Sequence, residues 1–570
     1  MIGDRPQSSH VDDLRTALAL LDRERPGFAP ATIAVVARRK PGAIAELVAA
    51  RFPSARVQLL ADEPLDHWAQ QRVPSSVRVD VGDLLEELPV RVLEHGTPEL
   101  LIDARGGAAS SSAKRIGVLL FAVSDGGAYL ATGAGPLRGD PSSGFDVAHG
   151  GDRSFATALT RLSSRREDRA DGEPERRNVA GVASESGAVL VTKAGRHHAK
   201  LDESQTAAVL TQRHGPGWGA ELHVRPAETV RSKAKVTVND AACEPWFPDR
   251  LHVPPMYVRE HLGAVCVPRQ IVVADPFIVP ASFHHPSMPW PRNRWTRDIT
   301  DQFVEIDADL EHAPRLPGTY FHLDSEIQAH FGHVFSEDAA KLWGWDLAQS
   351  RYPDIGVLRS TSEGEPEPPS FFLEALEAYG IERSRIVCIS GPVRVERLVT
   401  ASPLSHNRSV VYASELLIET WDRLREGLRS RSGRRAEKLF VTRPEGRRSC
   451  VNGDRLEAMF TEHGFELVQP ELLPLAEQAE CFASARVIAG YGGSAMLNML
   501  HAEHPGPRIV IAADTYPARN EYLIAALKGD DFHYFTCPAR PSHSPLAMHS
   551  DFEFDFERDG DALEQLLARV

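Results

Sequence analysis

The sequence predicts an α/β protein of several domains, in which parallel β-sheets are covered by helices. Its 570 residues exceed what one hydrophobic core organises, and at roughly 150 residues per domain they predict about three or four domains. Short apolar runs alternate with helical stretches in the first 135 residues and again from about residue 241, the pattern of helices packed on a parallel sheet. A charged segment, residues 161–178, lies between these regions.

The first α/β region is predicted over residues 1–160. Its expected strands are Ile33–Val36, Val57–Leu60, Val77–Val81, Leu100–Ile102 and Val118–Val123, and its expected helices lie near Asp12–Leu21, Ala43–Ala50 and Leu65–Gln71. The segments VGDLLEELPV, PELLIDARGG and LLFAVSDGGAYLATG weakly resemble the second half of a class I methyltransferase domain.

The turn after the first strand departs from that resemblance. Such enzymes place a glycine-rich turn there so that the backbone can approach the cofactor, whereas this chain reads VVARRKPGA with Gly42 as its only glycine. We therefore expect a degenerate methyltransferase-like domain that does not use S-adenosylmethionine. Retained methyl transfer, which would make the protein bifunctional, is the alternative.

The middle of the chain predicts connecting segments. Residues 161–178, RLSSRREDRADGEPERRN, contain a single apolar residue and cannot bury enough surface to offset their ordering entropy, so they predict a charged linker. Residues 179–240 show short Val, Ala and Leu runs broken by Gly and charge, and predict a β-rich connector.

From residue 241 the pattern predicts two consecutive doubly wound domains, residues 241–405 and 406–545, and then a tail, residues 546–570, with a short helix. The expected strands are Ile271–Ala274, Tyr320–Leu323, Arg385–Ile389, Leu439–Thr442, Glu466–Val468, Val487–Ala489 and Ile509–Ala512. The expected helices are Ser336–Trp345, Phe371–Tyr379, Glu415–Leu428, Gly453–His463 and Leu475–Ser484.

Charge and composition exclude several classes of partner. The chain has 64 Lys and Arg against 79 Asp and Glu, a net charge of −15 that repels polyanions, so nucleic acid is not expected as a partner. No apolar run approaches the roughly 18 to 20 residues that span a bilayer. The first residues lack the features of a signal peptide, and the six cysteines form no CxxC and no close pairs, so a cytoplasmic location is expected.

A glycine-rich turn is the first candidate binding element. Gly490-Tyr491-Gly492-Gly493 follows the predicted strand Val487–Ala489 and opens onto a helix that begins with Ser494. The N–H groups at a helix N-terminus and the positive end of its dipole suit an anion, so the turn predicts a phosphate site. In the alternative interpretation, Ser494 only caps the helix and the glycines only make a tight turn.

Arg443 follows the predicted strand Leu439–Thr442 and is expected at the same edge of the sheet, where open α/β sheets bind ligands. Its guanidinium could hold a diphosphate through two hydrogen bonds. The alternative is a solvated arginine at the rim of the sheet.

Together these residues resemble glycosyltransferase family 61. The matching positions, in order, are Arg443, Asn452, Gly464, Phe465, Glu477, Gln478, Gly490, Gly493, Ser494, Ala495 and Asn498. The family often carries His or Tyr where this chain has Gly492, so any donor contact from that position is lost here or moves to Tyr491. The resemblance implies that the nucleotide-sugar donor is held by Arg443, Glu477, Gln478, Gly490, Gly492, Gly493, Ser494, Ala495 and Asn498.

The resemblance extends upstream to HFGHVFSEDAAKLWGW, residues 330–345. His333 and Glu337 are four residues apart and share one face of a helix, so they can support each other. Histidine titrates in the range that a general base needs, so His333 is the candidate base and Glu337 orients it; Glu337 as the base itself is the alternative. The simpler interpretation is that His333 only caps or packs at the helix start. The family usually has Arg where Lys341 stands.

The resemblance, over residues 245–545, implies the GT-B arrangement of two facing Rossmann-like domains, with the donor held mainly by the C-terminal one. It implies an inverting, metal-independent transfer of a hexose or pentose to a hydroxyl of a glycan or other acceptor, as in polysaccharide biosynthesis. No cofactor is expected, and the donor is expected to be UDP-linked.

A metal site at His330, His333 and Glu337, with His322 near in sequence, is the rival interpretation of the upstream segment. A non-catalytic protein that binds nucleotide sugars or glycans is the rival function. His284 and His285 lie in a Pro-rich segment, predicted to be a surface loop, and have no assigned role.

Overall fold

The structure, a computed structural model, describes most of the chain. The residues outside the description are 1–8, 62–63, 66, 82–86, 106–108, 133–136, 141–143, 148–153, 164–177, 217, 219, 285–290, 292, 362–364, 366, 409, 430–434, 444–447 and 541–545. The chain divides into two compact units: unit 1 is Met1–Gly219 with Val272–Phe283 and Pro289–Asp309, and unit 2 is Ala220–Ile271 with His284–Met288 and Leu310–Val570. In the described part of the chain, no helix is both long enough and apolar enough to span a bilayer.

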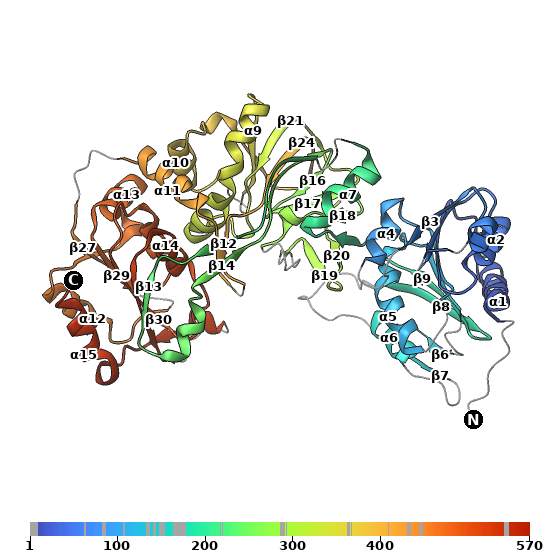
Figure 1. Cartoon of the computed structure of the whole chain (residues 1–570), viewed down its shortest axis with the longest axis horizontal. Helices are drawn as coiled ribbons and strands as arrows, with labels where there is room; N and C mark the ends of the chain where they lie inside the picture. The colour runs from blue at the N-terminus through green and yellow to red at the C-terminus, as the bar shows by residue number, and fades with distance from the viewer. Residues whose placement is uncertain are drawn as a thin grey trace. The chain divides into compact units, whose positions relative to one another are not determined.

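The N-terminal sheet of unit 1 has the strand order β3-β2-β1-β4-β5-β9-β8. Figure 1 labels β3, β9 and β8 of this sheet. These strands are β1 (Thr32–Ala37), β2 (Arg56–Ala61), β3 (Val77–Val81), β4 (Leu100–Asp103), β5 (Ala128–Ala131), β8 (Val179–Glu185) and β9 (Ala188–Lys193). Strands β1 to β5 are parallel, and β9 lies antiparallel between β5 and β8. Residues 179–193 therefore complete the N-terminal sheet, and the predicted boundary between this domain and a connector at residue 179 is wrong.

Helices and a second group of strands complete unit 1. The helices are α1 (Ser9–Glu24), α2 (Pro41–Arg51), α3 (His67–Arg72), α4 (Leu88–Glu94), α5 (Ala109–Leu119), η1 (Leu120–Ala122), α6 (Ser154–Ser163), α7 (Glu203–His214) and η3 (Pro280–Ser282). The further strands are β6 (Leu137–Asp140), β7 (Gly144–Val147), β10 (His198–Lys200), β17 (Ile271–Ala274), β18 (Phe277–Ile278), β19 (Thr296–Asp298) and β20 (Phe303–Ile306). Residues 164–177, most of the predicted linker, lie outside the described residues.

The predicted strand Val118–Val123 is wrong. These residues end α5 and form η1, and the strand that follows is β5. Ile116, Leu119 and Leu120 are fully buried in the helical segment. A short, wholly apolar run buried on all sides has no polar face, so its period does not distinguish a strand from a buried helix.

The first sheet of unit 2 contains the order β16-β24-β21-β22-β23, with β15 and β11 continuing from β24. Its strands are β11 (Ala220–Arg225), β15 (Met256–Leu262), β16 (Val265–Val267), β21 (Arg315–His322), β22 (Gly356–Ser360), β23 (Ile386–Ile389) and β24 (Val393–Ala401). The helical elements between them are α8 (Phe331–His333), η4 (Val334–Asp338), η5 (Ala339–Gly344), α9 (Trp345–Arg351), α10 (Ser370–Tyr379) and η6 (Arg383–Arg385). Strands β21, β22, β23 and β24 are mutually parallel, whereas β15 and β16 run antiparallel to β24.

The second sheet of unit 2 is parallel, with the order β13-β31-β30-β29-β27-β28. Its strands are β13 (Lys235–Val238), β27 (Lys438–Val441), β28 (Glu466–Val468), β29 (Val487–Tyr491), β30 (Pro507–Ala513) and β31 (Asp531–Cys537). Its helices are α12 (Gly453–Glu462), η7 (Pro470–Leu472), α13 (Leu475–Ser484), η8 (Ser494–His501), α14 (Asn520–Lys528) and α15 (Phe556–Leu567), and α11 (Leu416–Gly427) precedes it. The strand order reverses between β27 and β29, and open α/β sheets bind ligands at the carboxyl ends of such a pair.

Two further predicted boundaries differ from the structure. The segment predicted as a connector, residues 179–240, contributes strands to several sheets, including β11 and β13 in unit 2. The predicted tail packs into the core of the second sheet through Phe552, Phe554 and Leu563. Asn452 holds it there, donating from Nδ2 to the Phe554 carbonyl at 2.8 Å. The mixed α/β class is confirmed.

The remaining described elements are short. They are the strands β12 (Glu228–Arg231), β14 (Arg250–Val253), β25 (Ser405–His406), β26 (Tyr412–Ala413), β32 (Ala539–Arg540) and β33 (Asp551–Phe552), with the 3-10 turns η2 (Ala241–Trp246) and η9 (Ala547–His549).

Candidate active site

The glycine turn lies at the end of β29, beside the point where the sheet order reverses. Gly490 faces Val441 of β27, and a Cβ on it would lie 2.6 Å from the Val441 carbonyl oxygen and 2.9 Å from the Met496 sulfur. Only glycine therefore lets η8 pack this closely on β27. The helix begins at Ser494 as predicted, although it is a 3-10 helix.

Arg443 lies against this turn, as the sequence predicted. Its Nη2 donates to the Gly492 carbonyl at 2.9 Å and its Nη1 donates to the Arg448 carbonyl at 3.2 Å. Burial, and the charge of Arg448, lower the pKa of Arg443 to about 10, so it remains a cation at neutral pH. A Cβ on Gly493 would lie 2.1 Å from the Arg443 Nη2, so glycine at 493 makes room for the guanidinium.

Arg448 is a second cation at the turn, and the sequence analysis missed it. Its Nη2 would lie 3.7 Å from a Cβ on Gly493, and its guanidinium lies 5.5 Å from the centre of the Tyr516 ring. The Arg448 Nε is buried and, within the described residues, has no hydrogen-bond partner. Two guanidinium groups therefore flank the first turn of η8.

One N–H group of the turn is already occupied. The Gly493 N–H donates to the buried Glu521 Oε1 at 2.8 Å, and the Tyr516 hydroxyl donates to the same oxygen at 3.2 Å. Burial raises the pKa of Glu521. The N–H groups of Ser494 and Ala495, at the start of the helix, are those that a bound anion can use.

At position 492, where family 61 often carries His or Tyr and this chain has Gly, another side chain occupies the space. A Cβ on Gly492 would lie 2.9 Å from the Ala512 Cβ and 3.2 Å from the Tyr516 ring, so Tyr516 occupies the space. Tyr491, the predicted replacement, packs instead against Phe440 and Phe552 in the core on the other face of the sheet. The Tyr491 side chain therefore packs away from the turn.

Gln478 and Asn498 are buried behind the turn and meet each other. The Asn498 Nδ2 donates to the Gln478 Oε1 at 3.0 Å and to the Ala495 carbonyl at 3.1 Å. This pair fixes η8 against α13, so both side chains hold the turn in place. Glu477 is half-buried one residue earlier on α13, and no described contact joins its side chain to the turn.

The predicted base and its partner lie on one continuous helical segment, residues 331–351. Val334–Asp338 is a π-helical turn, and His333 and Glu337 still meet: His333 Nδ1 lies 2.6 Å from Glu337 Oε1. Burial alone would lower the pKa of His333, but the hydrogen bond to Glu337 and its charge outweigh it and raise the pKa. Burial alone would raise the pKa of Glu337, but the same contact with His333 outweighs burial and lowers this pKa to about 2. The ionised carboxylate only accepts, so Nδ1 carries the proton and Nε2 is left to act as the base.

The start of this segment packs on the glycine turn. A Cβ on Gly332 would lie 2.8 Å from the Ser494 Oγ and 3.1 Å from the His330 ring. Burial, His333 and the charge of Arg448 lower the pKa of His330. The structure thus brings together the two motifs that are separated by more than 100 residues in the sequence.

His284 also belongs to this group, and the sequence analysis assigned it no role. Its Nε2 lies 2.6 Å from Glu326 Oε2, and its Nδ1 lies 3.7 Å from Glu337 Oε2. Its neighbour His285 lies outside the described residues. No spacing in the sequence relates a histidine in a Pro-rich segment to a helix about 50 residues later.

A buried ion pair and a buried hydrogen bond fix the helical segment. Arg359 Nη1 donates to Asp338 Oδ2 at 2.5 Å, and Lys341 Nζ donates to the Asp324 carbonyl at 2.5 Å.

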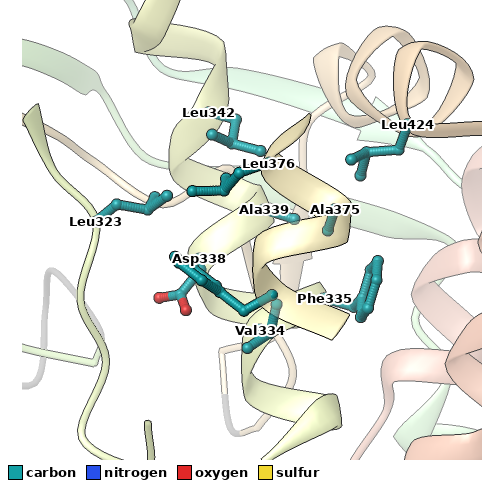
Figure 2. A pocket seen from close by; sticks show the side chains of 10 residues that line it. Leu323, Val334, Phe335, Asp338, Ala339, Leu342, Ala375, Leu376 and Leu424 are labelled. Atoms are coloured by element: carbon teal, nitrogen blue, oxygen red, sulfur yellow. The ribbon is translucent and has the colours of Figure 1, made fainter. Parts of the chain in front are cut away.

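Figure 2 shows Val334, Phe335, Ala339 and Leu342 against Ala375 and Leu376 of α10, around an apolar cavity of about 10 Å³. A space of this size holds at most about one water, so it is part of the packed core and not a substrate site.

The rival metal site requires a set of ligands close together. Among the residues that the structure describes, no three His, Cys, Asp or Glu side chains are grouped so that they could hold a metal ion. His322, the most distant member of the predicted set, is buried on β21, and burial lowers its pKa to about 4.

Comparison with known proteins identifies the C-terminal region. Residues 246–510 match the family described as Glycosyltransferase 61. The predicted resemblance of the C-terminal half is therefore confirmed. The match covers just under half of the chain and includes the glycine turn, Arg443, Arg448, His333 and Glu337, but not Tyr516 or Glu521. No curated protein matches the sequence.

Solved structures with some likeness to the chain include methyltransferases, the class that the N-terminal region resembles. They include the MycE methyltransferase of mycinamycin biosynthesis (16% identity, TM-score 0.22, 34% of this chain and 49% of that chain) and human N-acetylserotonin methyltransferase (13%, 0.20, 33% and 52%). An O-methyltransferase family protein from Burkholderia thailandensis is a third (16%, 0.21, 33% and 58%). The matched part spans about half of the length of the first two proteins. Likenesses at these TM-scores support no conclusion about activity.

We predict that S-adenosylmethionine does not raise the melting temperature of the protein. Arg38, Arg39 and Lys40 stand between β1 and α2, where close approach of a cofactor to the backbone needs glycine, and Lys40 adopts a φ of 52°. Asp103, at the end of the neighbouring β4, is already bound by Arg115 at 2.7 Å and Tyr129 at 2.9 Å. A thermal shift assay tests this, and a clear stabilisation would favour the bifunctional protein.

Proposed function

We propose that the protein is an inverting, metal-independent glycosyltransferase that moves a sugar from a nucleotide-sugar donor, UDP-linked in our expectation, to a hydroxyl of a glycan or other acceptor. The observation that carries this proposal is the meeting of the His333–Glu337 pair with the turn that Arg443 and Arg448 flank. An imidazole whose Nδ1 contacts Glu337 thus lies on a segment that packs against a candidate anion site, within a region that matches family 61.

The turn supplies the electrostatic part of the reaction. The N–H groups of Ser494 and Ala495 at the start of η8, the dipole of η8 and two guanidinium groups can hold a diphosphate. Preorganised charges of this kind stabilise the negative charge that develops on the leaving group. They can do so without a divalent cation.

His333 supplies the proton acceptor. As the acceptor hydroxyl oxygen attacks the anomeric carbon, its proton passes to His333 Nε2 and the new carbon–oxygen bond forms. The bond from that carbon to the diphosphate oxygen breaks, and its electron pair leaves with the nucleoside diphosphate. One in-line displacement inverts the anomeric centre.

The GT-B arrangement is part of this proposal. Unit 2 contains two sheets with parallel strands, and the segments that follow β21 in one and β29 in the other touch at Gly332 and Ser494. In that arrangement the donor binds to the second sheet and the acceptor approaches from the first.

Hydrolysis of a panel of nucleotide sugars by the pure protein tests the proposed function. We expect slow release of a nucleoside diphosphate from one donor and no loss of activity in EDTA. Activity that EDTA abolishes and zinc or manganese restores would favour the metal site at His330, His333 and Glu337. Binding of nucleotide sugars with no turnover in the presence of any acceptor would favour the non-catalytic binding protein.

We predict that Gly493→Ala weakens nucleoside diphosphate binding by about tenfold or more, the loss of one charge-assisted contact. The new Cβ would lie 2.1 Å from Arg443 Nη2 and would displace the guanidinium from the turn. Calorimetry measures the affinity. Gly391→Ala is the matched control, since a Cβ there has nothing within 4 Å. Equal affinities in the two variants would show that the Arg443 position is irrelevant to binding.

A further inference from the structure

Two side chains behind the His333–Glu337 pair form the rest of a chain of alternating carboxylates and imidazoles. In order, Glu326 Oε2 lies 2.6 Å from His284 Nε2, His284 Nδ1 lies 3.7 Å from Glu337 Oε2, and Glu337 Oε1 lies 2.6 Å from His333 Nδ1. The members come from three separate parts of unit 2: the segment after η3, the loop after β21, and the helical segment itself. Each side chain is about one quarter exposed, between 24% and 26%.

His284 lies between two carboxylates. Its Nε2 is within hydrogen-bond distance of Glu326 Oε2, whereas its Nδ1, 3.7 Å from Glu337 Oε2, is within ion-pair distance only. The outer oxygen of Glu337 is buried and has no hydrogen-bond partner within the described residues. The charge of His284 is one of the causes that lower the pKa of Glu337.

We propose that His284 and Glu326 are positioning residues for the proposed base: Glu326 orients His284, and His284 lies within ion-pair distance of the outer oxygen of Glu337, whose inner oxygen contacts the His333 ring. This inference rests on the proposed role of His333 and adds two residues to it. His284 also reduces the pull of Glu337 on the His333 proton, which sets the pH at which the base becomes available.

Several charged groups act on His333 and its partner besides His284. Glu337 and Asp338 lie on its own segment, Glu326 faces it from the loop after β21, and each raises the pKa of His333. His284 and Lys341 act on Glu337, and Arg448 acts on the neighbouring His330. The net effect raises the pKa of His333, so kcat/KM of the parent protein is expected to fall as the pH drops through a value above 6.5.

The test compares pH profiles of kcat/KM for the full-length parent, His284→Gln, His284→Lys and Glu326→Gln. His284→Gln removes the ion-pair partner of Glu337, so Glu337 holds the His333 proton more tightly and the acid limb moves to higher pH by about one unit. His284→Lys supplies a cation at the same position, and its acid limb stays near that of the parent. Glu326→Gln removes a negative charge, and its acid limb moves to lower pH. Opposite displacements cannot arise from a general loss of structure.

Turnover and binding give a second readout. We expect kcat of His284→Gln at its best pH to fall by less than the roughly 100-fold that losing a general base costs, with KM for the donor unchanged. His252→Gln, an exposed histidine on β14, is the matched control and should leave the profile unchanged. A parent-like profile and kcat in both His284→Gln and Glu326→Gln, together with an inactive His333→Ala, would overturn this inference alone. An active His333→Ala would overturn the proposed base and this inference with it.

Discussion

Replacing His333 by Ala is expected to lower turnover by roughly 100-fold or more, the contribution of a general base, and to leave nucleotide affinity nearly unchanged. The imidazole contacts Glu337 through Nδ1 at 2.6 Å, and its other nitrogen is left for the acceptor hydroxyl. The anion site is built from other residues, so the loss should appear in kcat and not in binding. Steady-state kinetics and calorimetry on the same preparation measure both.

The outcome for Glu337 decides between the two candidate bases. If His333→Ala is nearly as active as the parent and Glu337→Gln is inactive, the carboxylate is the base and the histidine only positions it. The low pKa of Glu337, about 2, argues against that outcome, because so weak a base is a poor proton acceptor at neutral pH.

Arg443→Ala is expected to cost about 1.5 to 3 kcal/mol of nucleoside diphosphate binding, the size of a charge-assisted contact. The side chain lies between the Gly492 and Arg448 carbonyls and lines the turn with its charge. Arg443→Lys keeps the charge but loses the fork of donors, so it should bind with intermediate affinity. Calorimetry with UDP, GDP, CDP and CMP provides the measurement.

Arg486→Ala is the matched control for this series, because Arg486 is exposed at the opposite end of β29 and pairs only loosely with Glu437 at 3.9 Å. Its affinity should equal that of the parent. If Arg443→Ala also binds every nucleotide like the parent, the diphosphate site lies elsewhere in the chain.

The local pattern predicts much of the second sheet of unit 2. Strands β27, β28 and β29 and helices α12 and α13 lie where the sequence predicts them, because each is a short apolar run or an amphipathic stretch bounded by Gly, Pro or a polar residue. The domain boundaries could not be predicted in the same way. β13 joins β31 nearly 300 residues later, and local sequence contains no information on such a pairing.

Site residues that belong to a local sequence pattern were predicted, whereas those that only the fold brings to the site were missed. Arg443, Gly493 and His333 each sit at a recognisable place in an element, so motif spacing finds them. His284, Tyr516 and Glu521 reach the site from loops or from a helix start with no motif of their own, and only the fold brings them there. Asn498 and Gln478 were predicted as donor contacts, but their mutual hydrogen bond buries both side chains behind the turn.

A structure of the protein with UDP bound, prepared in the presence of EDTA, tests the central claim most directly. The account predicts the diphosphate on the Ser494 and Ala495 N–H groups, with Arg443 and Arg448 within hydrogen-bond distance of its oxygens and no metal ion between them. A nucleotide bound within residues 1–135, or a diphosphate that contacts neither arginine, would contradict it.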